Sequence, residues 1–278
     1  PTTIIMITTI LTLLVLYILL FLYSLRIKDN SIVGVFWGFG FMIIAVLTFF
    51  QSERAIPEML ITGLVLLWWI RLTSHIGFRK LREWKEDPRY AKWREEWGSG
   101  WYFLIRSFLQ VYILQMILMI VVAIPILIVN LDWFSLLSFS VGESLSGTDP
   151  RLSPRMTKSE VFMILWALIA LSWLIFEAIA DRQLGRFIKI KKPGEIFTTG
   201  LYRYSRHPNY FWESMFWLGI SLISLQYSYL GIICWLSITF LLLFVSWVPL
   251  QEARYAGRAN WEEYKGKTSV FVPWFPKK

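Results

Sequence analysis

Long stretches without charged residues restrict what this chain can fold into. Residues 4–22 and 230–245 contain no charged side chain and consist mostly of Ile, Leu, Val and Phe. In a helix, roughly 20 such residues cross the ~30 Å hydrocarbon core of a bilayer. Charged residues make up only 17% of the 278 residues, whereas soluble domains carry about 25%. We therefore expect an all-α, polytopic integral membrane protein, and we exclude a soluble enzyme, a disordered chain and a disulfide scaffold.

The apolar runs predict about seven transmembrane helices. We expect them at residues 3–25, 32–50, 56–76, 102–129, 159–180, 209–226 and 228–250. The first run lacks a basic segment before it and a cleavage signature after it, so it is expected to be a retained helix. Lys and Arg concentrate in residues 79–94, in residues 182–206 and after residue 250. Because cytoplasmic loops carry the excess of Lys and Arg, we expect the N-terminus outside and the C-terminus in the cytoplasm. The loop 130–158, with Arg151 and Arg155, fits this orientation least well.

The formal net charge of +9 has two interpretations. Basic cytoplasmic loops close to anionic lipid account for it, and so does a cytoplasmic ligand that bears phosphate. Nucleic acid is excluded as a partner, because membrane spans interrupt the basic residues. The charge alone does not choose between lipid and ligand.

Several ionisable or amide side chains lie next to apolar segments, where such groups mark functional sites. Glu177 and Asp181 are four residues apart and share one helix face. Asn209 and Glu213 share a face of the following span, with Arg206 and His207 just ahead of it. Pro208 suits the first turn of that helix. A helix start beside Arg, His and Asn suits a phosphate or a polar cofactor, although a basic interfacial anchor would explain the aromatic and basic residues among them.

Three further polar positions can be interpreted either as ligand contacts or as ordinary residues of the membrane interface. Arg254 and Tyr255, after the last span, could lie over a cytoplasmic opening or belong to an amphipathic interfacial tail. Arg71 on the third span could contact a ligand or simply extend to the interface. No dinucleotide fingerprint, serine-nucleophile pattern or metal-ligand spacing is found, so no metal site is expected.

The sequence at residues 200–213, which contains Arg-His-Pro-Asn-Tyr, resembles the steroid 5α-reductase C-terminal family, particularly its bacterial branch. The similarity extends from about residue 70 through the segments 86–90, 180–184, 192–195 and 268–273. Sterol reductases carry a similar element, and membrane methyltransferases carry a shorter version, Arg-His-Pro-x-Tyr. The resemblance implies one membrane domain, 1–278, in which residues 1–76 supply three helices and residues 77–278 carry the cofactor site.

The resemblance also implies NADPH as cofactor, held in a cavity that faces the cytoplasm. The implied contact positions are Arg71, Asp181, Arg186, Lys189, Lys191, Arg206, His207, Asn209, Tyr210, Glu213, Arg254 and Tyr255.

In the steroid enzymes a Gln–Glu pair and a Tyr polarise the substrate ketone. Counted without gaps from Arg71, those positions fall on Val33, Gly34 and Trp68; a shifted register brings in Gln51 and Glu53. The candidate catalytic residues are therefore Gln51, Glu53, Glu177 and Tyr210, with Tyr255 as a further candidate acid.

The implied activity is reduction of an activated C=C bond in a lipidic substrate, similar to that of a 3-oxo-5α-steroid 4-dehydrogenase acting on CH–CH groups. We expect an integral protein of the bacterial inner membrane, a monomer, with the bilayer and a hydrophobic small molecule as its partners. Two alternatives stay open: a membrane methyltransferase using S-adenosylmethionine, and a lipid-binding membrane protein without enzymatic activity.

Overall fold

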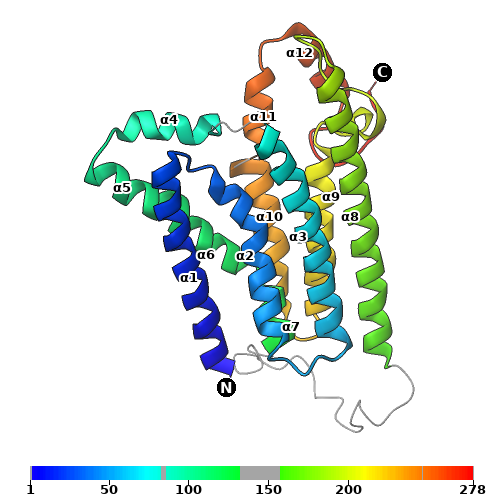
Figure 1. Ribbon diagram of the computed structural model, residues 1–278. Helices are drawn as coiled ribbons and strands as arrows, with labels where there is room; N and C mark the ends of the chain where they lie inside the picture. Colours follow the sequence, from blue (N-terminus) through cyan, green and yellow to red (C-terminus); the bar gives the residue numbers. More distant parts are fainter. Residues whose placement is uncertain (1, 83–85, 132–156, 246, 278) are drawn as a thin grey trace. The chain divides into compact units, whose positions relative to one another are not determined.

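The structure is a computed structural model. It describes residues 2–82, 86–131, 157–245 and 247–277, and the side chains of these residues apart from residue 2 and residues 78–82. Most of the predicted loop 130–158, including Arg151 and Arg155, lies outside the described residues. Within the described residues all regular structure is helical (Figure 1).

Six helical segments are long and apolar enough to cross a membrane in the part of the chain that the structure describes. They are Thr3–Ile27, Ile32–Phe49, Ile56–Gly77, Trp101–Val122, Lys158–Ile190 and Tyr229–Tyr255. The predicted span 209–226 is helix α9, Pro208–Ser224, whose 17 residues are shorter than the other six segments. Many large apolar side chains on these segments are exposed, for example Ile4, Leu11 and Leu168. The predicted all-α polytopic membrane fold is thus confirmed.

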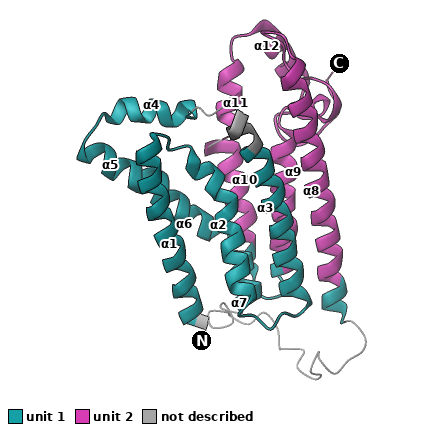
Figure 2. Cartoon of the chain, in the orientation of Figure 1, with its two compact units in different colours: residues 1–161, 224–231 teal, residues 162–223, 232–278 magenta. Residues whose placement is uncertain are grey.

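The described helices cluster as two compact units (Figure 2). Unit 1 comprises residues 1–161 and 224–231, and unit 2 comprises residues 162–223 and 232–278. Each unit is described by itself below. The prediction of one membrane domain divided at residue 76 stays a prediction.

Unit 1 contains the helices of the first half of the chain and one short helix from residues 224–231. They are α1 (Thr2–Ile27), α2 (Ile32–Phe49), α3 (Ile56–Arg82), α4 (Pro88–Trp97), α5 (Trp101–Ser107), the π-helix η1 (Phe108–Ile113), α6 (Leu114–Val122), α7 (Ile124–Leu131) and the short 3₁₀ helix η5 (Tyr229–Gly231). The predicted span 102–129 is interrupted at Ala123, and Pro125 is the second residue of α7, a position that proline tolerates. The turn at Ala123 therefore separates α7 from the span that ends at Val122.

Close packing and polar contacts hold the helices of unit 1 together. A Cβ atom added to Gly40 on α2 would lie 2.2 Å from the sulfur of Met119 on α6, so the Met119 side chain packs directly against the backbone of α2. Buried Asn130 on α7 donates from Nδ2 to Thr48 Oγ1 at 2.9 Å and to Thr62 Oγ1 at 3.2 Å. Hydrogen bonds of this kind join helices in an apolar environment.

Unit 2 contains the helices that follow the undescribed loop. They are α8 (Lys158–Ile190), the 3₁₀ helix η4 (Gly200–Arg203), α9, α10 (Ile232–Phe240), the π-helix η6 (Leu241–Val245), α11 (Trp247–Tyr255) and α12 (Ala259–Lys267). A Cβ atom on Gly219 of α9 would lie 2.6 Å from the Cβ of Ala170 on α8. These two small residues let α8 and α9 approach closely, as small residues do at membrane helix interfaces.

Candidate functional site

The segment that leads into α9 is fastened to the last turns of α8. Gly200 has a φ of +62°, and a Cβ at this position would lie 2.5 Å from Oε1 of Gln183. The same oxygen accepts a hydrogen bond of 2.9 Å from the backbone N–H of Leu201. Glycine is therefore required at residue 200 for both its backbone conformation and its close contact with α8.

Two of the predicted site residues meet where α8 and α9 pack together. Asn209 donates from Nδ2 to Oδ1 of Asp181 over 3.2 Å, and both side chains are buried. Glu177, one helical turn before Asp181, is buried as well, whereas Glu213, one turn after Asn209, is half-buried. The structure thus brings the Asp181 carboxylate and the Asn209 amide from two helices into contact, whereas the spacing in the sequence indicates only which residues share each helix face.

Arg206 is held by protein groups on several sides. Its Nε donates to Oε1 of Glu252 at 2.9 Å and its NH2 donates to Oε2 at 3.1 Å, which makes a bidentate pair. NH1 donates to the backbone carbonyls of Lys265 and Thr268 at 3.0 and 2.7 Å. The Arg206 guanidinium also lies 6.0 Å from the centre of the Trp261 ring. This geometry gives Arg206 a positioning role in fastening the C-terminal segment.

His207 shares the carboxylate that pairs with Arg206. Its Nε2 lies 2.8 Å from Oε1 of Glu252, and a carboxylate only accepts, so the hydrogen is assigned to Nε2. The imidazole is buried and stacks on the Tyr210 ring with centroids 5.8 Å apart. Tyr210 in turn stacks on Trp247, with centroids 6.1 Å apart. Glu252 therefore holds one end of an aromatic stack that contains two predicted site residues, His207 and Tyr210.

The chain after α12 runs beside the segment 202–206. The backbone N–H of Arg206 donates to the carbonyl of Ser269 at 2.8 Å, and that of Trp274 donates to the carbonyl of Tyr204 at 2.9 Å. Ser205 donates from Oγ to the carbonyl of Phe271 at 2.7 Å. The hydroxyl of Tyr264 donates to the carbonyl of Tyr202. The C-terminal segment thereby covers the approach to α9.

Tyr202 combines burial with a hydroxyl that has no partner. Only 5% of the residue is exposed, and its hydroxyl has no hydrogen-bond partner within the part of the chain that the structure describes. Burial, followed by the nearby groups Asp181, Tyr210 and Tyr264, raises the pKa of Tyr202 well above its ordinary value. The hydroxyl therefore keeps its proton at neutral pH beside the Asp181–Asn209 contact.

The sequence interpretation missed two of these residues. It proposed no role for Tyr202 beyond the alternative of an interfacial anchor, and it did not single out Glu252. The available signal for Glu252 is the one that singled out Glu177, namely a carboxylate at the end of an apolar run. Burial of Tyr202 depends on the distant C-terminal segment, which no local pattern reveals.

The remaining predicted cofactor residues of unit 2 differ in exposure. Tyr255 is half-buried and stacks on Trp261 with centroids 5.0 Å apart. The predicted cations around the end of α8 and in the last turn of α11 are exposed; they are Arg186, Lys189, Lys191 and Arg254. A cleft of about 490 Å³ starts at Phe187 on the same end of α8 and has Arg203 and Lys267 on its wall. Glu195 and Glu263 also line it, so the cleft is lined by both signs of charge.

The other predicted site residues lie in unit 1. Gln51 and Glu53 are exposed in the turn between α2 and α3, and Arg71 is half-buried on α3. Their part in the site stays a prediction. Among the described residues no three His, Cys, Asp or Glu side chains gather closely enough to hold a metal ion.

The fold and the buried polar cluster define an all-helical polytopic membrane protein with ionisable groups at the ends of its apolar helices. A model of the family DUF1295, proteins of unknown function, matches residues 20–268, and the chain belongs to this family. No curated protein and no solved structure matches the chain. The match includes every candidate site residue of both units.

Proposed function

We propose that this protein is a membrane oxidoreductase that reduces an activated C=C bond of a lipidic substrate with hydride from NADPH. One observation carries the proposal. Asp181 and Asn209 form a buried hydrogen bond between α8 and α9, and both occupy positions that resemble cofactor contacts of the steroid 5α-reductase C-terminal family. Isolated polar groups are costly among apolar helices, so a buried pair at these two positions favours a site over a simple helix end.

The residues present fit a dinucleotide cofactor. A buried amide and carboxylate suit a neutral carboxamide, which both donates and accepts hydrogen bonds. Exposed Arg186, Lys189 and Lys191 suit phosphates, and so do Arg203 and Lys267 on the neighbouring cleft. NADPH supplies the hydride when it is bound. Arg206 contributes indirectly, because its guanidinium already donates to Glu252 and to two carbonyls.

The proposal assigns proton transfer to a hydroxyl of this chain. Tyr202 is buried near Asp181, and its hydroxyl has no hydrogen-bond partner in the described residues, so its proton is available to an atom that develops negative charge during the reaction. Tyr210 and Glu177 stay candidates for the same role. The C-terminal segment hydrogen-bonds along residues 202–206, where Tyr202 and Ser205 are buried, and so limits the access of water to the Tyr202 hydroxyl.

The orientation, the membrane and the oligomeric state of the protein are part of the same proposal. The positive-inside rule places the basic segments, and with them the Asp181–Asn209 region, on the cytoplasmic side. We propose a monomer in the bacterial inner membrane, with the N-terminus outside and a substrate that reaches the site from the bilayer.

The test is a thermal-shift measurement in detergent with NADPH, NADH and S-adenosylmethionine. NADPH is expected to raise the melting temperature, since a ligand that binds only the folded state stabilises it. Asn209→Ala and Glu213→Gln are expected to weaken NADPH binding by about tenfold or more, as the loss of one hydrogen bond to a buried polar group implies. Glu160→Gln, at a half-buried glutamate in the first turn of α8 that accepts a hydrogen bond from the backbone N–H of Thr157, serves as the matched control.

The other outcomes have distinct meanings. Stabilisation by S-adenosylmethionine alone would replace the proposal with a methyltransferase. Stabilisation by no nucleotide would leave a lipid-binding protein. Unchanged NADPH binding in Asn209→Ala would mean that the Asp181–Asn209 contact is not part of the cofactor site.

A further inference from the structure

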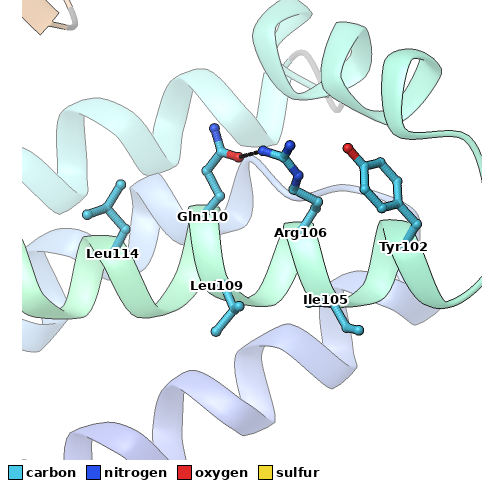
Figure 3. A pocket seen from close by; sticks show the side chains of 6 residues that line it. All are labelled: Tyr102, Ile105, Arg106, Leu109, Gln110 and Leu114. Atoms are coloured by element: carbon cyan, nitrogen blue, oxygen red, sulfur yellow. Dashed lines mark hydrogen bonds between the residues drawn. The ribbon is translucent and has the colours of Figure 1, made fainter.

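A stripe of mixed side chains runs along the continuous helix formed by α5, η1 and α6 in unit 1. Tyr102, Arg106, Gln110 and Leu114 follow one another at intervals of four residues. Together with Ile105 and Leu109 they line a groove of about 480 Å³. Figure 3 shows Tyr102, Arg106 and Gln110 directed to one side of the helix, and Ile105 and Leu109 to the other. The groove therefore has a polar wall and an apolar wall.

Arg106 is a cation inside a segment that is apolar enough to span a membrane. It is exposed, it lies within the span Trp101–Val122, and its NH1 donates to Oε1 of Gln110 at 3.1 Å. Its guanidinium lies 5.4 Å from the centre of the Tyr102 ring. Within the described residues no carboxylate pairs with it and only one of its N–H donors is used. An unpaired charge of this kind is costly beside lipid, so it favours an anionic partner.

The neighbouring cations are already paired. Arg94 pairs with Glu86, Arg89 with Asp87, and Lys92 with Glu96. Arg106 is thus the one cation between residues 86 and 114 for which the described residues provide no carboxylate. The π-helix η1, which begins two residues later, is an additional sign, since π-helical turns are frequent at functional sites.

Aromatic residues place this end of the helix at the membrane surface. Trp101 is 81% exposed and Tyr102 is exposed as well, as expected for the aromatic belt at a bilayer interface. Arg106 follows Trp101 by five residues, which is about 7.5 Å along an α-helix. A long arginine side chain extends over such a distance to reach the headgroups. Its guanidinium therefore meets the layer in which lipid phosphates lie.

We propose that this groove binds one anionic phospholipid. The phosphate lies against Arg106, Tyr102 and Gln110, and an acyl chain lies against Ile105, Leu109 and Leu114. Charge complementarity selects the occupant, because a groove with a bare cation at its headgroup end and apolar side chains below it matches an acidic amphiphile. The groove belongs to unit 1 and the Asp181–Asn209 contact to unit 2, and the lipid-binding proposal does not depend on the proposed reductase activity.

The test counts bound lipids by native mass spectrometry of the full chain in detergent, titrated with phosphatidylglycerol or with phosphatidylcholine. Wild type is expected to bind phosphatidylglycerol more tightly than phosphatidylcholine. Arg106→Gln is expected to weaken phosphatidylglycerol binding by about tenfold, the usual order for losing a charge-assisted contact. Its phosphatidylcholine binding should stay within about twofold, because the apolar wall is intact. Arg106→Lys keeps the charge and should retain most of the preference.

The matched control is Arg54→Gln, because Arg54 is also exposed and also lies over an aromatic ring, that of Phe50. It should bind both lipids as wild type does. The proposal is overturned if wild type shows no preference for phosphatidylglycerol, or if Arg106→Gln and Arg54→Gln behave alike. Loss of a protein dimer in Arg106→Gln with unchanged lipid binding would assign the groove to a second copy of the chain instead.

Discussion

Each of the two units contains a bidentate arginine–glutamate pair that fastens a connecting segment to helices. In unit 1, Arg94 donates to Glu86 at 2.8 and 3.2 Å. In unit 2, Arg206 donates to Glu252 at 2.9 and 3.1 Å. Each guanidinium also lies near an aromatic ring, that of Phe103 or that of Trp261.

The two pairs differ in what the glutamate contacts next. Glu86 accepts a hydrogen bond of 2.8 Å from the backbone N–H of Asn30, whose side chain continues to Ser107 and Ser24. These are neutral groups with their hydrogen bonds made, and they serve only to join the α1–α2 connection to α5. Glu252 instead contacts His207, whose ring stacks on Tyr210. The same type of arginine–glutamate pair therefore joins a connecting segment to helices in unit 1 and orients the imidazole ring of His207 in unit 2.

The largest effect is expected from Glu252→Ala. The side chain of Arg206 is 8% exposed, and removal of one partner from a buried ion pair leaves an uncompensated charge, which costs about 3 kcal/mol or more. The melting temperature in detergent should therefore fall steeply. NADPH binding, measured below the melting temperature, should weaken as well, because His207 and Tyr210 lose their support.

Glu252→Gln provides the finer version of this experiment. Glutamine keeps one acceptor for Arg206 and has nearly the same shape, so the protein should stay folded. Weakened NADPH binding in this variant supports a positioning role for Glu252. Full retention of both stability and NADPH binding in Glu252→Ala would show that the pair has no consequence in solution.

A smaller effect is expected from Glu86→Ala in unit 1. Arg94 is 26% exposed, so water compensates part of the lost pair, and the loss should be about 1–2 kcal/mol. NADPH binding should not change, because the network of Asn30, Ser24 and Ser107 contains no residue of the proposed site. If Glu86→Ala weakens NADPH binding as much as Glu252→Gln does, the contrast between the two pairs is wrong.

Sequence patterns were sufficient for the fold class, and they indicated which polar residues of the candidate site share a helix face. Uncharged runs such as 4–22 and 230–245 require helices in lipid, because only helices satisfy the backbone of such a segment. The spacing of Glu177 and Asp181, and of Asn209 and Glu213, already indicates shared helix faces. The contact between Asp181 and Asn209 then needs only that α8 and α9 pack together, which Ala170 and Gly219 allow.

The long-range contacts could not be predicted. Arg206 is 46 residues from Glu252 and 62 from Thr268, and nothing local links these positions. The sequence therefore assigned Arg206 to phosphate, the partner that its helix-start setting suggests. The end of α6 was also missed, because the apolar run continues through Ala123 into α7 without a change in composition.

The smallest effects on stability are expected from two tyrosines of unit 2, and the two variants separate a structural role from a catalytic one. Tyr264→Phe removes the hydroxyl that donates to the carbonyl of Tyr202, which should cost about 1 kcal/mol of stability. Tyr202→Phe removes a buried hydroxyl without a partner in the described residues, so stability should stay the same or rise slightly. If Tyr202 donates the proton, only Tyr202→Phe should lower kcat by about 100-fold at unchanged NADPH affinity.

Alkaline pH provides an independent check on the burial of Tyr202. Because burial raises the pKa of Tyr202 above that of tyrosine in the unfolded chain, the folded protein holds a proton that the unfolded chain releases. Stability is therefore fully present below about pH 10 and falls as the pH rises above that value. Wild type should lose more stability than Tyr202→Phe between neutral pH and pH values above about 10. Equal losses in the two proteins would mean that Tyr202 is open to water, and the proton donor would then have to be sought at Tyr210 or Glu177.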